Sequence, residues 1–214
     1  NIDKYVASEG SASITLQNPD GIGSLYLLFD LEYGAYTVTD DATGQSFTAG
    51  QYGFLHEYLD LSALFGAPLT SVTLEFGNGP VRLSEVYVLS PGSAPDFVQQ
   101  WQPPLDGKAD IVLFSTHGDD EQLYFAGLLP YYAGELGCGV QVVYLTDHRN
   151  FTLARTHEML NGLWSVGVTA YPVFGGFADF RIDSLQGTYD HYANKYSTSK
   201  EELQSFVLEQ IRRF

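Results

Sequence analysis

The chain has 214 residues, 44% of them hydrophobic, which is enough for one large domain or two modest ones. Its 26 acidic residues outnumber 10 basic ones, and the net charge of -16 argues against binding to nucleic acids or anionic membranes and suits neutral glycans. No apolar run approaches the roughly 20 residues that cross a bilayer. The single cysteine, Cys138, excludes an internal disulfide, and its glycine neighbours favour a small buried residue over a nucleophile.

Residues 1–90 have the pattern of an all-β domain. Short runs rich in β-branched and aromatic residues alternate with turn signals such as Asp40-Asp41-Ala42-Thr43-Gly44. The strands predicted from these runs cover residues 12–17, 24–31, 35–39, 54–61, 71–76 and 81–89. No convincing helix interrupts them, and the regular spacing predicts a β-sandwich of jelly-roll type.

The closing half of this region resembles galactose-binding-like (discoidin-like) domains. The resemblance lies in strand pattern, over residues 58–62, 72–76 and 83–88. Four tyrosines could form a sugar-stacking surface: Tyr26, Tyr33, Tyr36 and Tyr52. Alternating aromatic residues are also how a sandwich fills its interior, so we expect most of them to be core or ordinary surface residues.

Residues 91–107 hold two proline clusters and predict a semi-rigid linker, in which Phe97, Val98 and Trp101 pack along a domain face. From residue 108 to 214, strands alternate with helices. This pattern predicts the α/β class, with an incomplete, Rossmann-like doubly wound parallel sheet. The expected strands are 110–115, 140–145 and 170–174, and the expected helices are 120–135, 153–166 and 199–214.

Three details of this second region are also predicted. Pro130 should kink the helix at 120–135 or end it early. The tyrosine-rich stretch 189–197 should be a loop long enough to act as a lid. His157 should be an exposed residue of the helix at 153–166.

The stretch Thr116-His117-Gly118-Asp119-Asp120-Glu121 stands where the first of these strands passes to a helix, which is where open α/β sheets bind ligands. An imidazole and a carboxylate three residues apart can both reach one metal ion, while Asp119 can hold a water. The competing interpretation is that Asp119 and Asp120 only cap a helix. His148 follows the next strand on the same edge and is a candidate to touch substrate or to bind the metal, with a solvated loop residue as the alternative.

The order of these features resembles the PIG-L / LmbE-like family of zinc-dependent N-acetylglucosamine deacetylases. It runs from a strand and His-x-Asp-Asp-Glu through Gly137-Cys138-Gly139 and a second strand to Arg155-x-x-Glu158 and the Gly-Phe-x-Asp at residues 176–179. The resemblance covers roughly residues 108–214. It departs from the family at Gly118, where the family has proline.

The resemblance implies a hydrolase that uses Zn²⁺ or another divalent metal to remove the N-acetyl group from an amino sugar or glycoconjugate. It implies that His117 and Asp120 bind the metal and that Asp119 is the base acting on a zinc-bound water. Arg155 and Asp179 would face the sugar, although an ion pair of Arg155 with Glu158 is an alternative for the arginine. The family's third ligand is a later histidine, which would lie beyond Phe214.

Two other classes of function are weighed against this one. A glycan-binding protein with an inactive deacetylase-like domain is the main alternative. A nucleotide-binding protein is disfavoured, because the acidic stretch at residues 117–120 occupies the place of a glycine-rich phosphate loop. We expect a secreted or cell-surface bacterial protein.

Overall fold

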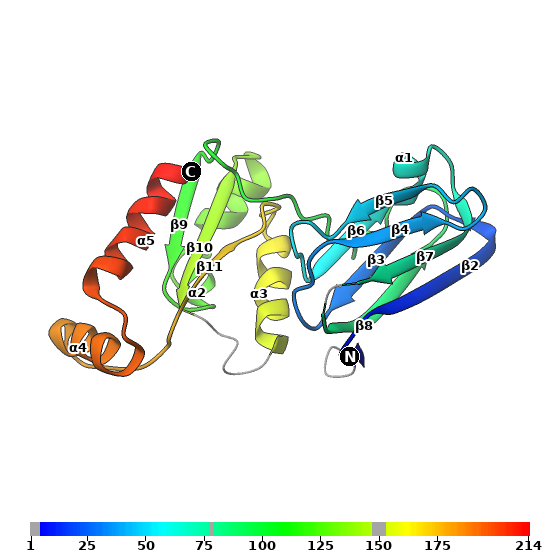
Figure 1. Ribbon diagram of the computed structural model, residues 1–214. Helices are drawn as coiled ribbons and strands as arrows, with labels where there is room; N and C mark the ends of the chain where they lie inside the picture. Colours follow the sequence, from blue (N-terminus) through cyan, green and yellow to red (C-terminus); the bar gives the residue numbers. More distant parts are fainter. Residues whose placement is uncertain (1–4, 78, 147–152) are drawn as a thin grey trace. The chain divides into compact units, whose positions relative to one another are not determined.

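The computed structural model describes residues 5–77, 79–146 and 153–214. The chain divides into two compact units, Asn1–Trp101 and Gln102–Phe214, and the division lies inside the stretch expected to be a linker. Unit 1 consists mainly of antiparallel strands, and unit 2 combines parallel strands with helices (Figure 1). In the described ranges no helix has both the length and the apolarity needed to cross a membrane.

Unit 1 is built from two four-stranded antiparallel sheets, with strand orders β1-β8-β3-β6 and β2-β7-β4-β5. The strands are β1 (Val6–Ser8), β2 (Ala12–Ile22), β3 (Ser24–Phe29), β4 (Tyr36–Asp40), β5 (Ser46–Ala49), β6 (His56–Asp60), β7 (Leu69–Phe76) and β8 (Val81–Leu89). The rings of Phe29 on β3 and Phe76 on β7 are buried with their centroids 6.2 Å apart. The two sheets therefore share one apolar core.

The aromatic residues of unit 1 mostly fill that core. Tyr26, Tyr33 and Tyr36 are 3%, 5% and 3% exposed, whereas Tyr52 is 55% exposed. Three of the four tyrosines therefore lie in the core, and Tyr52 lies at the surface. Phe97 also packs on the unit, with ring centroids 5.3 Å from Tyr87 and 6.4 Å from Tyr26, as expected of the linker.

The sequence patterns missed three short elements of unit 1. Strands β1 and β5 are only three and four residues long, too short for an alternating pattern to stand out. A five-residue helix, α1 (Leu61–Phe65), follows β6, because the Asp60 carboxylate accepts a hydrogen bond from the Ala63 amide and Gly66 ends the helix at φ 81°. The expectation that residues 1–90 contain no helix is therefore wrong at residues 61–65.

Unit 2 contains a three-stranded parallel sheet in the order β11-β10-β9. The strands are β9 (Ile111–Ser115), β10 (Val140–Thr146) and β11 (Val173–Phe177). The helices are α2 (Asp120–Leu123), the π-helix η1 (Pro130–Glu135), α3 (Leu153–Ser165), α4 (Leu185–Tyr196) and α5 (Lys200–Arg213). Val143 of the central strand pairs with Phe114 on one side and Val173 on the other. This pairing brings the carboxyl ends of three strands to one edge.

The expected fold class, an α/β protein with a Rossmann-like doubly wound sheet, is wrong. Of the eleven strands in the described residues, eight belong to antiparallel sheets and three to the parallel one. Those three strands follow one another across the sheet in chain order, without the reversal that defines a doubly wound fold. Strand order depends on long-range packing, which the local alternation of strand and helix patterns does not determine.

Three local predictions in unit 2 are also corrected. The helix expected at 120–135 consists of four residues of α2 and, after a gap, of η1, which begins at Pro130, a helix start being where proline's missing N–H is tolerated. The expected lid loop at 189–197 is mostly helix α4, which Ser184 caps by accepting from the Gly187 amide. His157 is 1% exposed, because it faces inward from α3.

Candidate functional site

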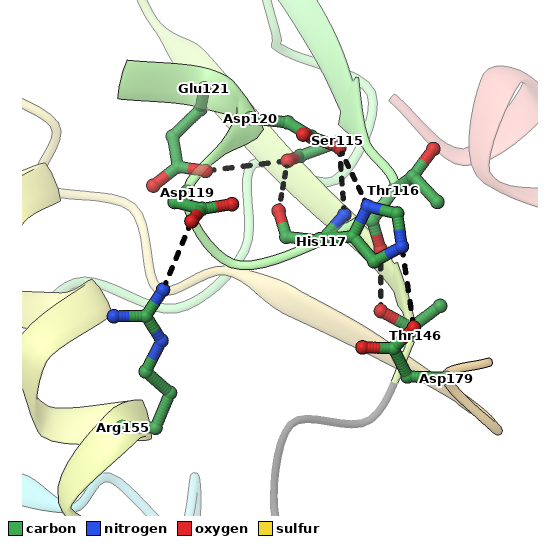
Figure 2. Close-up of polar contacts among 9 residues, drawn as sticks. All are labelled: Ser115, Thr116, His117, Asp119, Asp120, Glu121, Thr146, Arg155 and Asp179. Atoms are coloured by element: carbon green, nitrogen blue, oxygen red, sulfur yellow. Dashed lines mark hydrogen bonds and ion pairs between the residues drawn. The ribbon is translucent and has the colours of Figure 1, made fainter. Parts of the chain in front are cut away.

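A tight turn after β9 brings the two expected metal ligands together. The Asp120 carboxylate accepts a hydrogen bond from the backbone N–H of His117 at 2.9 Å, and the same oxygen lies 3.2 Å from His117 Nδ1 (Figure 2). Because α2 begins at Asp120, its first residue points its carboxylate back over the turn. The i, i+3 spacing therefore places the imidazole and the carboxylate side by side.

Asp179 approaches the opposite side of the same imidazole. It follows β11, and its Oδ1 lies 3.3 Å from His117 Nε2 (Figure 2). The side chain of His117 is 43% exposed, and those of Asp120 and Asp179 are each 21% exposed. Both ring nitrogens of His117 thus face carboxylates that come from different strand ends.

Asp119 occupies the N-cap position of α2 without capping it. Within the described residues its carboxylate makes no capping hydrogen bond, and its φ of -147° and ψ of -9° depart from the usual N-cap geometry. Its Oδ2 instead lies 3.3 Å from Arg155 Nη2 on α3 (Figure 2). The interpretation of Asp119 as a mere cap is therefore wrong.

Arg155 makes the ion pair that the sequence suggested and a second one. Its Nη1 lies 3.1 Å from the carboxylate of Glu158 on the same helix, while Nη2 contacts Asp119. All three side chains are at least a third exposed, so each pair contributes less than about 1 kcal/mol to stability. The pairs orient Asp119 more than they stabilise the fold.

Two hydroxyl groups hold the backbone that leads into the turn. Ser115 Oγ donates to the carbonyl of His117 at 2.6 Å, and Thr146 Oγ1 donates to the carbonyl of Thr116 at 2.6 Å. Thr146 ends β10, so the ends of two neighbouring strands hold the backbone of Thr116 and His117. Neither hydroxyl group is predicted from the sequence, since a serine or threonine at a strand end has no distinctive signal.

Glu121 lies behind the turn and is fully buried. One of its carboxylate oxygens is 3.3 Å from Ser115 Oγ, and the other has no hydrogen-bond partner among the described residues. Burial raises the pKa of Glu121. Burial and then the nearby Glu121 raise the pKa of Tyr144 well above its ordinary value, although the two groups lie outside hydrogen-bond geometry. The site thus combines exposed and buried carboxyl groups in one short stretch.

An open hollow of about 510 Å³ lies over one side of His117. It is lined by His117, Asp179, Phe180, Arg181 and Ile182. Arg181 is the positively charged residue of this lining, and its side chain is 96% exposed. The hollow gives a ligand access to the His117–Asp179 side of the turn.

His148, the third candidate for substrate contact, lies outside the described residues. Over the ranges 5–77, 79–146 and 153–214, no group of three or more histidine, cysteine, aspartate or glutamate side chains is arranged to hold a metal ion. The described residues thus bring together five of the expected site residues: His117, Asp119, Asp120, Asp179 and Arg155. Two neighbouring atoms among them, Nδ1 of His117 and Oδ2 of Asp120, could bind one metal ion.

Comparison with known proteins adds little to this geometry. No family model matches the chain, and no curated protein matches it. One solved structure that matches is the flavohem-like FAD/NAD binding domain of nitric oxide dioxygenase from Vibrio cholerae O1 biovar El Tor. It is 15% identical over 85% of this chain and 78% of that chain, with a TM-score of 0.19. Similarity this low supports no conclusion about fold or function.

Proposed function

We propose that this protein is a metal-dependent hydrolase that removes the N-acetyl group from an N-acetylated amino sugar or glycoconjugate. The observation that carries the proposal is the turn after β9, where His117 and Asp120 lie side by side and Asp119 does not cap the helix. The resemblance of this stretch to PIG-L / LmbE-like deacetylases supplies the reaction. The acidic chain favours a neutral glycan as the substrate.

His117 and Asp120 are spaced as two of the ligands of a zinc ion would be. Two ligands of one tetrahedral zinc, each roughly 2.0–2.1 Å from the metal, lie roughly 3.3 Å apart. The distance of 3.2 Å between His117 Nδ1 and Asp120 Oδ2 matches this separation. The chemistry that zinc supplies when bound is Lewis acidity toward the acetamide carbonyl and toward water.

Asp119 takes the role of general base. Its carboxylate accepts a proton from the attacking water, whose oxygen forms a bond to the acetyl carbon. The bond between that carbon and the sugar nitrogen then breaks, and the proton passes from Asp119 to the leaving amine. The products are acetate and the free amino sugar. Arg155 orients the carboxylate of Asp119 through the 3.3 Å contact, and the resemblance implies that it also faces the sugar.

The test replaces Asp119 by asparagine, which keeps the size of the side chain and removes its capacity to take up a proton. Acetate release from N,N′-diacetylchitobiose and zinc content are measured for the wild type, Asp119→Asn and the control Asp96→Asn, an exposed aspartate of unit 1. Asp119→Asn should keep its zinc and lose activity by about 10²-fold or more, the usual scale for a positioned base. Activity within a few-fold of the wild type at equal zinc content would refute the assignment.

The second candidate is a glycan-binding protein with an inactive deacetylase-like unit. It is favoured by the small number of metal ligands, because the described part of the chain brings together two, His117 and Asp120, where a catalytic zinc has three. The same experiment separates the two, because a glycan-binding protein would bind chitobiose without releasing acetate, whatever metal is added.

A further inference from the structure

We propose that Asp179 is a positioning residue for His117, and that its carboxylate accepts a hydrogen bond from Nε2–H so that Nδ1 faces Asp120 and the metal. This inference rests on the proposed function. It assigns to Asp179 a role distinct from the contact with sugar that the family resemblance implies.

The geometry of the imidazole leads to this assignment. A neutral histidine carries its proton on one ring nitrogen and offers a lone pair on the other, and a metal ion takes the lone pair. His117 Nδ1 lies 3.2 Å from Asp120, and Nε2 lies 3.3 Å from Asp179. The two nitrogens point in different directions, so a metal shared with Asp120 leaves Nε2 to carry the proton. A carboxylate that accepts from that N–H is the usual partner of a metal-bound histidine.

Asp179 is held in place from behind by helix α4. The hydroxyl of Tyr192 donates to the carbonyl of Ala178 at 2.9 Å. The Tyr192 ring packs on the two phenylalanines that flank the segment, with centroids 4.6 Å from Phe180 and 6.3 Å from Phe177. Packing against α4 therefore holds the segment on both sides of Asp179, as a residue that positions His117 requires.

The test measures zinc affinity by competition with a chelator for the wild type, Asp179→Ala, Asp179→Asn and the control Asp183→Asn, an aspartate of the same segment whose side chain is 96% exposed. Asp179→Ala should weaken zinc binding about 10–100-fold, the usual effect of removing such a partner. Asp179→Asn should lose less, because its amide oxygen still accepts from Nε2–H. Tyr192→Phe should lose up to about fivefold, because one hydrogen bond that holds the segment is removed.

Two further measurements separate positioning from contact with sugar. At saturating zinc, a positioning role lowers kcat and leaves KM nearly unchanged, whereas a sugar contact raises KM. In zinc-loaded wild type, ¹⁵N NMR of His117 should show the proton on Nε2. Thermal unfolding of Asp179→Asn and Asp179→Ala checks that both variants are folded.

Three results would overturn the inference. The first is unchanged zinc affinity with a raised KM in Asp179→Ala. The second is loss of zinc as complete as in His117→Ala, which would make Asp179 a ligand. The third is a proton on Nδ1 in the zinc-loaded protein. If the wild type binds no zinc, the proposed function itself is overturned. That result differs from the three above, so failure of the proposed function can be told apart from failure of the positioning role.

Discussion

Carboxyl groups in this protein occupy two contrasting environments. Asp119 and Asp120 are partly exposed and take part in polar contacts at the turn. Glu57 on β6 and Glu121 behind the turn are buried. Burial raises the pKa of Glu57 from 4.5 to about 7, although a hydrogen bond from the Gly50 backbone opposes the shift. Burial thus sets Glu57 and Glu121 apart from the partly exposed carboxylates of the turn.

The raised pKa of Glu57 predicts that stability falls as the pH rises. Because the folded protein holds this proton up to about pH 7 and the unfolded chain releases it near 4.5, the folded state binds more protons between these values. The effect of Glu57 should therefore reduce the free energy of unfolding by about 3 kcal/mol between pH 4.5 and pH 7. Urea unfolding at pH 5 and pH 8 measures it.

Glu57→Gln provides the matched comparison, since glutamine has the same size and no proton to release. Glu121 contributes equally to the pH dependence of the wild type and of Glu57→Gln. The difference between the two pH profiles of unfolding free energy therefore measures the effect of Glu57. A Glu57→Gln variant with the full pH dependence of the wild type would contradict the prediction.

The helices of unit 2 differ in how strongly local signals define them. Helix α5 has a complete capping box, in which Ser199 accepts from the Glu202 amide at 3.1 Å and Glu202 accepts from the Ser199 amide at 2.6 Å. Its first turn is acidic and its last turn carries Arg212 and Arg213, as the helix dipole favours. Helix α2 has only four residues, so its position depends on the packing of Glu121 against the sheet.

Ser199→Ala should destabilise unit 2 by about 0.5–2 kcal/mol, because the Glu202 amide loses its acceptor at the start of α5. Chemical unfolding followed by circular dichroism measures the change. Ser205→Ala, at an exposed position inside the same helix, is the control and should be neutral or slightly stabilising, since alanine is the better helix former. Equal effects of the two substitutions would show that the capping box does not stabilise α5.

At the scale of the whole molecule, the two units are organised by different kinds of pairing. Unit 1 joins antiparallel strands around a core that includes Phe29 and Phe76. Unit 2 buries its central strand β10 almost completely, with Val142, Val143 and Tyr144 inaccessible to solvent. Each unit therefore has apolar residues enough for a core of its own.

This organisation predicts that residues 1–101 fold without the rest of the chain. The fragment should show a β-type circular dichroism spectrum and one cooperative unfolding transition, because both of its sheets and the core between them lie within it. It should also keep the pH dependence caused by Glu57. A fragment without a cooperative transition would show that its stability depends on residues 102–214.

Local sequence accounts for the parts of the structure that depend on residues a few positions apart. The spacing of His117 and Asp120 predicts their contact, because a strand end followed by a helix start places an i, i+3 pair on one side of a turn. The capping box at Ser199 is equally local. The start of η1 at Pro130 is also local, because proline's missing N–H is tolerated in the first turn of a helix.

Packing between distant segments decided the rest. The approach of Asp179 to His117 and of Arg155 to Asp119 requires particular strand and helix positions, which no local periodicity encodes. The same holds for strand order, where an expected doubly wound sheet proved to be three strands in chain order. Hydrophobic burial is non-directional, so a pattern of apolar residues shows which face of a helix or strand is buried. It does not show which other element packs on that face, because this depends on the tertiary structure.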